Sequence, residues 1–207
     1  MLNCKTARDV MKIVRDRNVS FIQIWFTDVL GMMKSFAITP SELEGALTEG
    51  MGFDGSSIEG FARIEESDMI AKPDPTTFQF IPWRPKERPV GRMFCDILQP
   101  DGSHYEGDSR YALKRMTEKA IAKGYNLYLG PELEYFYFQD PDSPKILDRG
   151  GYFDPPPLDV AGDLREIPFL PCRRWESRWN TAIMRLPPAS TRLICAMTTP
   201  CAWLTRL

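Results

Sequence analysis

The first hundred residues of this 207-residue chain predict an α+β fold, in which one or two helices accompany a small β-sheet. Three observations predict it: a helical spacing of apolar residues after Thr6, a hairpin pattern over residues 20–38, and short strand-like runs separated by turn residues up to Gly102. With 43% hydrophobic residues, the chain can bury the core of one domain or of two small ones.

The N-terminal segment predicts a helix followed by a hairpin. Thr6 can cap a helix over Ala7–Asp16, whose apolar residues recur every three to four positions. Ser20–Asp28 is rich in β-branched and aromatic residues, and a turn at Asp28–Gly31 leads into a second strand over Met32–Ile38.

The next segment predicts a second helix and the rest of the sheet. Thr39-Pro40-Ser41-Glu42 combines a capping residue, a proline and a glutamate three positions after the cap, so a short helix should follow and run to Glu49, before Gly50. Further strands are expected at Met69–Lys72, Thr77–Ile81 and Arg92–Leu98, the last followed by a turn at Gln99–Gly102.

A second unit is expected to begin between Gly102 and Asp108. Ser109–Lys123 has a helical pattern, and Tyr125–Phe138 predicts one long strand. The domain boundaries that we expect are therefore 1–103 for the first unit, 104–165 for the start of a second, and 166–207 for a tail of different composition.

Charge and cysteine usage exclude several classes of function. The net charge is −2 with acids and bases interspersed, which predicts neither a nucleic-acid face nor a membrane-binding basic run. No apolar run reaches the ~18 residues of a membrane span, and the charged N-terminus is not that of a signal peptide, so we expect a cytoplasmic protein. The five cysteines lack CxxC spacing and are expected to be reduced.

The segment GPELEYFYF (Gly130–Phe138) places two acids in an apolar, strand-like run. Glu132 and Glu134 would share one face of a strand, with Cα atoms about 6.5–7 Å apart. Burying two neighbouring carboxylates is costly unless cations compensate, and Mg²⁺ or Mn²⁺ would do so best because they prefer oxygen ligands. The alternative is an edge strand on which both acids face water.

A second candidate site is the Gly- and Ser-rich segment Met51–Gly60, which surrounds Asp54 with small and hydroxylated residues. Such a loop can cradle a polar ligand. The alternative is a turn at Asp54-Gly55, in which the aspartate accepts a hydrogen bond from its own backbone. The segment has neither the lysine of a P-loop nor the glycine spacing of a dinucleotide-binding turn.

Four segments in this order resemble the N-terminal third of bacterial glutamine synthetases (glutamate–ammonia ligases). They are FDGSSIEGFARIEESDMIAKPD (Phe53–Asp74), CDILQPDG (Cys95–Gly102), GPELEYFYF, and GGYFDPPPLDVAGDLR (Gly150–Arg165), so that the resemblance covers about the first 165 residues. It implies a β-grasp N-terminal domain followed by the truncated start of an α/β catalytic domain. It also implies the ATP-dependent ligation of ammonia to glutamate through γ-glutamyl phosphate, with two Mg²⁺ or Mn²⁺ ions, in a dodecamer.

The resemblance further implies roles for four residues. Glu134 would bind the metal ion near glutamate and ammonia, and Glu132 the metal ion that accompanies the ATP phosphates. Asp54 would bind and deprotonate ammonium, from a loop that reaches into the active site of a neighbouring subunit. Arg63 lies where some relatives use an arginine in feedback control.

Beyond Arg165 the resemblance ends and the composition changes. All 14 glycines lie at or before Gly162, and no lysine or aspartate follows Asp163. With scattered tryptophans, prolines and no sustained period, the tail is expected to be poorly structured. Permitted codons for Trp179–Ala189, read in a shifted frame, allow Glu-Tyr-Ser-His-His-Glu-Val-Ala-Pro, which resembles the continuation of the family. We therefore hypothesise a shift of the reading frame near Arg165–Ile167.

Three functions follow as alternatives. The chain is the N-terminal part of a glutamine synthetase that is inactive alone, a non-catalytic fragment that docks onto full-length subunits, or an independent module that binds divalent metal ions.

Overall fold

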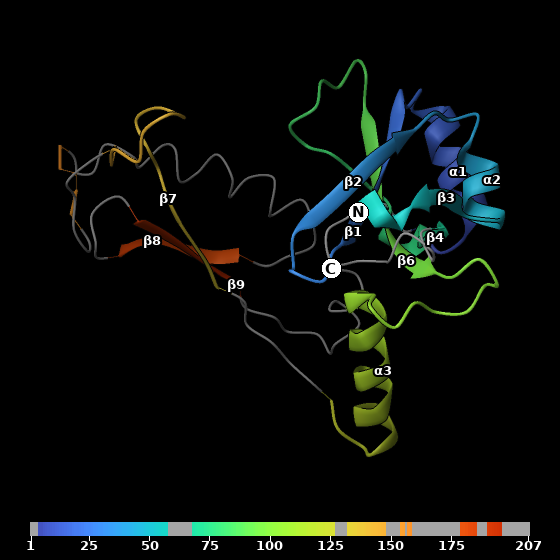
Figure 1. Ribbon diagram of the computed structural model, residues 1–207. Coiled ribbons are helices and arrows are strands. Elements are labelled where there is room, and N and C mark those ends of the chain that lie inside the picture. Colours follow the sequence, from blue (N-terminus) through green and yellow to red (C-terminus); the bar gives the residue numbers. More distant parts are fainter. Residues whose placement is uncertain are drawn as a thin grey trace. The chain divides into compact units, whose positions relative to one another are not determined.

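The computed structural model of the protein describes residues 4–57, 68–126, 132–147, 154–155, 157–158, 179–185 and 190–195 (Figure 1). The chain divides into two compact units after Leu127. The first unit contains α1 (Ala7–Asp16), α2 (Leu43–Thr48), α3 (Ser109–Ala122) and strands β1 (Phe21–Thr27), β2 (Met33–Ile38), β3 (Met51–Asp54), β4 (Asp68–Pro73), β5 (Gln79–Phe80) and β6 (Val90–Leu98). The second contains β7 (Glu132–Phe136), β8 (Trp179–Arg185) and β9 (Ser190–Cys195).

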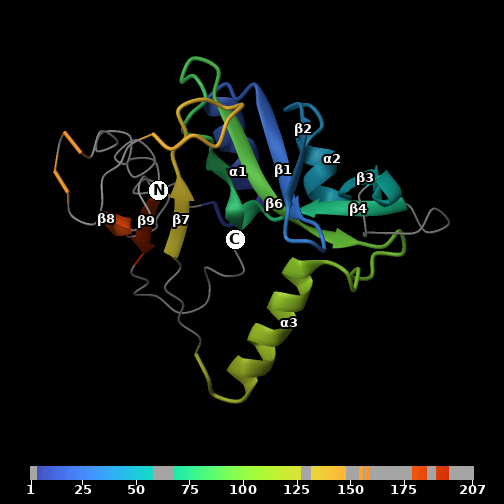
Figure 2. The same ribbon diagram turned by 60° about the vertical axis from the view of Figure 1, so that its left-hand side comes forward.

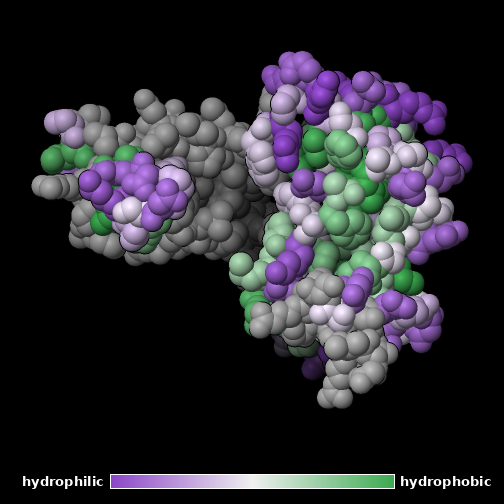
Figure 3. Space-filling model, turned by 45° about the horizontal axis from the view of Figure 1, so that its top comes forward, coloured by the Kyte–Doolittle hydropathy of each residue, from purple (hydrophilic) through white to green (hydrophobic). Residues whose placement is uncertain are grey.

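The strands of the first unit form a mixed sheet in the order β2-β1-β6-β4-β3, with β5 paired to β6. β1 pairs in parallel with β6, while β2 and β4 join the sheet antiparallel. Helices α1 and α2 lie on the same side of these strands (Figure 2). Between the helices and the sheet lies one core, which includes Val10 of α1, Leu43 of α2, Ile24 of β1 and Met93 of β6. The space-filling view shows polar residues around an apolar strip on one face of this unit (Figure 3).

The predicted first helix and hairpin are confirmed. Thr6 and Asp9 form a capping box at the start of α1, which ends at the predicted Asp16. The hairpin between β1 and β2 turns at Asp28, whose Oδ1 accepts hydrogen bonds from the backbone N–H of Leu30 and Met32 at 2.9 and 2.8 Å. This local bonding explains why a turn forms without the Asn-Gly pair of the tightest hairpins.

The second helix forms, but its predicted capping box is wrong. α2 begins at Leu43, its N-cap is Glu42, and no side chain caps it. The Thr39 hydroxyl instead lies 2.6 Å from the Ser41 hydroxyl, so it does not bond the helix backbone. The predicted end is confirmed, because Gly50 follows the C-cap with a φ of +93°, a conformation that favours glycine.

Three strand predictions need correction in extent. Thr77–Ile81 is not one strand: Asp74 caps a short 3₁₀ helix over Pro75–Thr77, which leaves only Gln79–Phe80 in the sheet. Met51–Asp54, interpreted as part of a loop, is strand β3. The long strand predicted over Tyr125–Phe138 is described as β7 from Glu132 to Phe136, while Tyr125 and Asn126 are not in a strand and 127–131 lie outside the described residues.

Strand β6 lies between β1 and β4, which pair with different parts of its length. Residues Val90–Phe94 pair with β1, whereas Cys95–Leu98 pair with β4. Beyond Trp25 and Phe94, the last pair in the β1–β6 register, the two parallel strands separate. The first turn of α3 lies at this opening.

The second unit contains an antiparallel sheet in the order β7-β9-β8, in which β7 is an edge among the described strands. Residues 166–207 were expected to lack regular structure, yet the backbone of Trp179–Arg185 and Ser190–Cys195 runs as strands. Their sequences contain the Trp, Ile and Thr residues that suit strands. β9 pairs with β7 and β8, and these long-range hydrogen bonds cannot be predicted from the local sequence of the tail. Within the described residues, no helix combines the length and apolar character that a membrane crossing requires.

Candidate functional site

Asp54 is the last residue of β3, and the alternation of this strand turns it outward. Met51 and Phe53 pack against the core, and Phe53 meets the ring of Phe26 at 5.4 Å, so Gly52 and Asp54 are exposed on the other face. This alternation was the signal in the sequence that could have predicted β3. The strand thus presents the Asp54 carboxylate to solvent at its end.

The turn after Asp54 is the one foreseen as the simpler alternative. Asp54 Oδ1 accepts hydrogen bonds from the backbone N–H and the hydroxyl of Ser56, at 2.9 and 2.6 Å. Both bonds restrict the rotation of the carboxylate. Across the β3–β4 pair, Asp54 lies opposite Asp68, which is also exposed, so two acids meet at the end of this hairpin. Asp54 can form this turn and also bind a cation, because its exposed carboxylate lies beside a second acid, Asp68.

Glu132 and Glu134 lie two positions apart in β7, as predicted. In the backbone register of β7 with β9, Glu132 is opposite Ile194 and Glu134 is opposite Arg192. Because β7 is at the edge of this sheet, the alternative stated from the sequence, a pair of acids that face water, still applies. Their side chains, like Arg63, lie outside what the structure describes. Among the residues whose side chains it does describe, no three of His, Cys, Asp or Glu come together as a metal-binding group.

The structure reveals a charged cluster that the sequence did not predict, at the junction of α3 with the sheet. Arg110, in the first turn of α3, lies 2.6 Å from Asp96 of β6 and 2.7 Å from Asp74, which follows β4. Lys114, one turn later, lies 2.7 Å from Asp96. Asp108 caps α3 through the N–H of Arg110 at 3.0 Å and also accepts a hydrogen bond from the N–H of Ile97 at 3.1 Å. Together these contacts tie α3 to β6.

Burial and pairing shift the pKa values of this cluster in opposite directions. Burial opposes the charge of Asp74, but hydrogen bonds from Thr76 and Arg110 outweigh it, so the pKa of this carboxyl is lowered. Burial raises the pKa of Asp108, and its two backbone donors do not compensate fully. Burial also acts on Arg110, but the neighbouring Asp96 and Asp74 carboxylates raise its pKa. The guanidinium is therefore held in its charged form by its two partners.

The sheet with two helices on one side defines the first unit as an α+β domain, and comparison with known families specifies its type. The family model described as "Glutamine synthetase, beta-Grasp domain" matches residues 18–100. The β-grasp domain expected at 1–103 is thus supported as a fold over most of that range.

The chain is also similar to curated glutamine synthetases. It is 49% identical over 162 residues to that of Mycolicibacterium smegmatis, an alignment covering 75% of this chain and 36% of that protein. It is 47% identical over 170 residues to that of Methanosarcina mazei, covering 80% and 38%. Over this matched part, the chain belongs to the glutamine synthetase family. It spans little more than a third of the length of these relatives.

Solved structures share the fold at lower identity. One described as apo GmaS without ligand superposes with a TM-score of 0.82 at 23% identity, covering 90% of this chain and 44% of that chain. The glutamine synthetase of Plasmodium falciparum superposes with a TM-score of 0.80 at 19% identity, covering 92% and 44%. The likeness in fold therefore extends over more of the chain than the 75–80% covered by the sequence alignments.

Proposed function

We propose that this chain is the N-terminal part of a cytoplasmic, ATP-dependent ligase that joins ammonia to glutamate through γ-glutamyl phosphate. The observation that carries this proposal is the 47–49% identity to glutamine synthetases over 162–170 residues. Glutamate, ammonia and ATP are accordingly the proposed substrates, and a homo-oligomer is the proposed assembly of the whole enzyme.

In this proposal Glu132 and Glu134 are ligands of two Mg²⁺ or Mn²⁺ ions. Neighbouring carboxylates on one strand suit hard divalent cations, which neutralise the charge that develops on phosphate oxygens during phosphoryl transfer. Each ion takes about six oxygen ligands, so two glutamates leave both coordination shells incomplete. Further ligands must come from other parts of a complete enzyme, which is why we expect this chain to be inactive alone.

Asp54 is proposed to bind ammonium and accept its proton. Support comes from the exposure of its carboxylate at the end of β3 and from the two hydrogen bonds of Ser56 that orient it. The neighbouring Asp68 adds a second negative charge that favours a cation at this end of the hairpin. Arg63 remains a proposed site of feedback control, by resemblance.

The tail from residue 166 is proposed to result from a shifted reading frame near Arg165–Ile167. One observation supports it: shifted codons permit the sequence that glutamine synthetases carry next, whereas the tail as written resembles the family in neither sequence nor composition. Resequencing the gene across codons 160–180 tests this directly. An unbroken frame, aligned with that of close relatives and still encoding this tail, would overturn it.

Activity assays test the ligase proposal. The 207-residue chain should form no glutamine from glutamate, ammonia and ATP, whereas a gene with the frame restored should encode an active enzyme. In that restored enzyme, Glu134→Gln should reduce turnover by more than the about 10- to 100-fold typical of an outer-shell partner of a metal ion. Glu118→Gln, on the exposed surface of α3, is the matched control and should leave turnover unchanged. An inactive restored enzyme, or an active Glu134→Gln variant, would contradict the proposal.

One observation favours docking onto full-length subunits as a second function. The turn of the β1–β2 hairpin exposes four apolar side chains: Val29, Leu30, Met32 and Met33, at 45–70% exposure. A cluster of this kind is more typical of a contact surface than of a free turn. The chain should therefore co-purify with a full-length glutamine synthetase, and the variant Leu30→Asp with Met32→Asp should not. Equal recovery of both, or of neither, would count against docking through this turn.

A further inference from the structure

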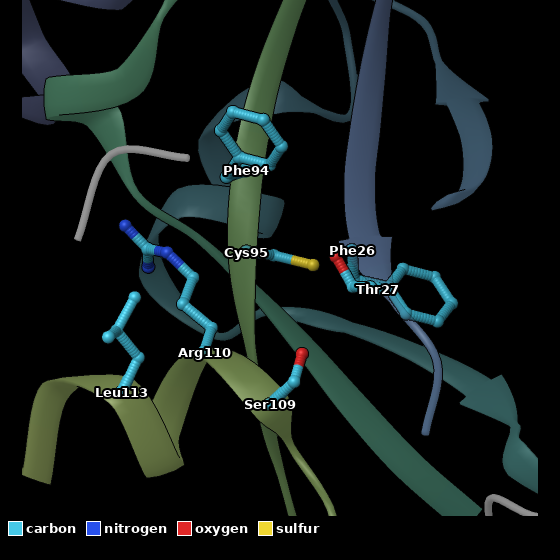
Figure 4. Close-up of a pocket in the computed structure, with 7 residues that line it drawn as sticks. All are labelled: Phe26, Thr27, Phe94, Cys95, Ser109, Arg110 and Leu113. Carbon is cyan, nitrogen blue, oxygen red and sulfur yellow. The ribbon is translucent and has the colours of Figure 1, made fainter. Parts of the chain in front are cut away.

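A cavity of about 200 Å³ lies where β1 and β6 separate, beside the first turn of α3. Among the described residues it is lined by Phe26, Thr27, Phe94, Cys95, Ser109, Arg110 and Leu113, which belong to these three elements (Figure 4). All belong to the first unit. The cavity lies where the pairing of β1 with β6 ends at Trp25 and Phe94, while the other edge of β1 stays paired with β2 as far as Thr27.

The inner walls of the cavity are apolar. Phe26, Phe94 and Cys95 are at most 5% exposed, and Leu113 adds an alkyl wall from α3. Figure 4 shows the Cys95 thiol pointing toward Thr27, at the end of β1. The thiol donates a hydrogen bond to the Trp25 carbonyl at 3.5 Å, and burial raises its pKa, so it lines the cavity as a neutral group.

Two hydroxyl groups supply the polar character of the cavity. The side chains of Thr27 and the exposed Ser109 extend toward the same space from opposite elements (Figure 4). Within the described part of the chain, neither hydroxyl forms a hydrogen bond with another residue. Each can donate to or accept from a ligand, so the pair suits a molecule with one small polar group.

The charges near the cavity exclude an anionic ligand. Arg110 lines it, but this guanidinium already pairs with the partly buried Asp74 and Asp96, and Asp108 contributes a third carboxylate, which is buried. Among the described residues of this cluster, three carboxylates (Asp74, Asp96 and Asp108) lie beside two cations (Arg110 and Lys114). An additional negative charge would enter a site that is already net negative, at a cost that burial increases.

We propose that this cavity binds a small, uncharged aromatic molecule that carries one hydroxyl or N–H group, such as a phenol. A dry cavity of about 150 Å³ is large enough for benzene, so this volume admits a single ring with one substituent. The ring would lie against Phe94 and Leu113, and its polar group would reach Thr27 or Ser109. For about seven non-hydrogen atoms, we expect a dissociation constant on the order of a millimolar or below. The inference does not rest on the proposed ligase activity.

Alkylation of Cys95 provides a test on the full 207-residue chain. Its rate of reaction with iodoacetamide is followed by peptide mass spectrometry, with phenol as the probe. Occupancy slows the reaction by a factor of one plus the ratio of ligand concentration to dissociation constant, hence about elevenfold at ten times that constant. Cys4, buried in the same core but outside the cavity, is the internal control and should be slowed less than Cys95, because the ligand shields only Cys95 directly. Benzoate, an anion of similar size, should protect neither thiol.

Matched variants locate the effect. Leu113→Trp fills the cavity and should abolish protection by phenol, whereas Met116→Trp, at a side chain 59% exposed in the next turn of α3, should retain it. If Leu113→Trp does not fold by circular dichroism, Ser109→Leu at the mouth of the cavity replaces it. The proposal is overturned if phenol leaves the Cys95 rate unchanged, slows Cys4 equally, or still protects Cys95 in the filled variant. Equal protection by benzoate overturns the assignment to an uncharged ligand.

Discussion

Arg110 Nη1 lies 2.6 Å from Asp96 Oδ1, and the two side chains are only 7% and 18% exposed. This ion pair joins the first turn of α3 to the strand at the centre of the β-grasp sheet. Arg110 Nη2 lies 2.7 Å from Asp74 Oδ2, so this one residue connects α3 both with β6 and with the segment that follows β4. The direction in which the chain leaves the β-grasp domain is thus set by a charged contact.

Removing Arg110 should destabilise the first unit strongly. Arg110→Met leaves Asp74 and Asp96 without their shared partner in a largely buried site, and breaking a buried pair in this way costs about 3 kcal/mol or more. Urea unfolding followed by circular dichroism measures the loss. Arg115→Met is the control, because Arg115 pairs with Glu106 at the surface, with 45% and 71% exposure, and should change stability by less than about 1 kcal/mol. Equal effects of the two variants would contradict the structural role of Arg110.

Asp108 should stabilise the contact between α3 and β6, because it accepts hydrogen bonds from backbone N–H groups of both elements. Asp108→Ala removes the N-cap of α3 and leaves the N–H of Ile97 without its acceptor in the core, so we expect a loss of about 2 kcal/mol. In hydrogen exchange, the amide of Ile97 should lose protection more than those of the β1–β2 hairpin. Asp101→Ala, which affects only an exposed turn at Ser103, should leave the exchange of Ile97 unchanged.

The low pKa of Asp74 predicts a specific dependence of stability on pH. Because its pKa in the folded state lies below the unfolded value of about 3.9, ionised Asp74 stabilises the fold above that pH. This contribution is lost as the pH falls through the folded pKa. The stability difference between the native chain and Asp74→Asn should therefore be largest near neutral pH and shrink below about pH 4. A difference that stays constant down to pH 2 would show that the charge of Asp74 contributes nothing.

Two glycines close in sequence should respond oppositely to alanine. At Gly50, with a φ of +93°, a Cβ would meet Ile70 Cγ2 and lie 3.2 Å from the Ala71 carbonyl oxygen, so Gly50→Ala should cost more than about 1 kcal/mol. Gly45 lies inside α2 with no atom near the position of a Cβ, so Gly45→Ala should stabilise by about 0.5–1 kcal/mol. Thermal unfolding of both variants checks the signs. A stable Gly50→Ala protein would mean that the turn into β3 tolerates a side chain.

Local signals explain what could be predicted. The Thr6 capping box and the apolar spacing of α1 involve residues within one or two turns, and they predicted the helix to the residue. The β-branched and aromatic residues of β1 and the Asp28 turn likewise lie within one hairpin. For the candidate site, the pattern GPELEYFYF correctly placed Glu132 and Glu134 in a strand, while their proposed role as metal ligands came from the resemblance.

What was missed depends on residues far apart in the chain. β3 is a strand because β4, some 17 positions later, pairs with it, and an alternation over only four residues is too short to predict a strand by itself. The start of α2 is an exception, because it was missed for a local reason: the Thr39 hydroxyl bonds that of Ser41, two positions away, instead of the helix backbone.

The sequence by itself determined the α+β class, the family and the positions of Asp54, Glu132 and Glu134, because these depend on short motifs and on local periodicity. Only the tertiary structure decided that Arg110 would meet Asp74 and Asp96, separated from it by 36 and 14 positions. The same holds for the cavity, whose lining comes from β1, β6 and α3. Both features arise near the point where the pairing of β1 with β6 ends, and such pairing is a property of the folded sheet that no single segment encodes.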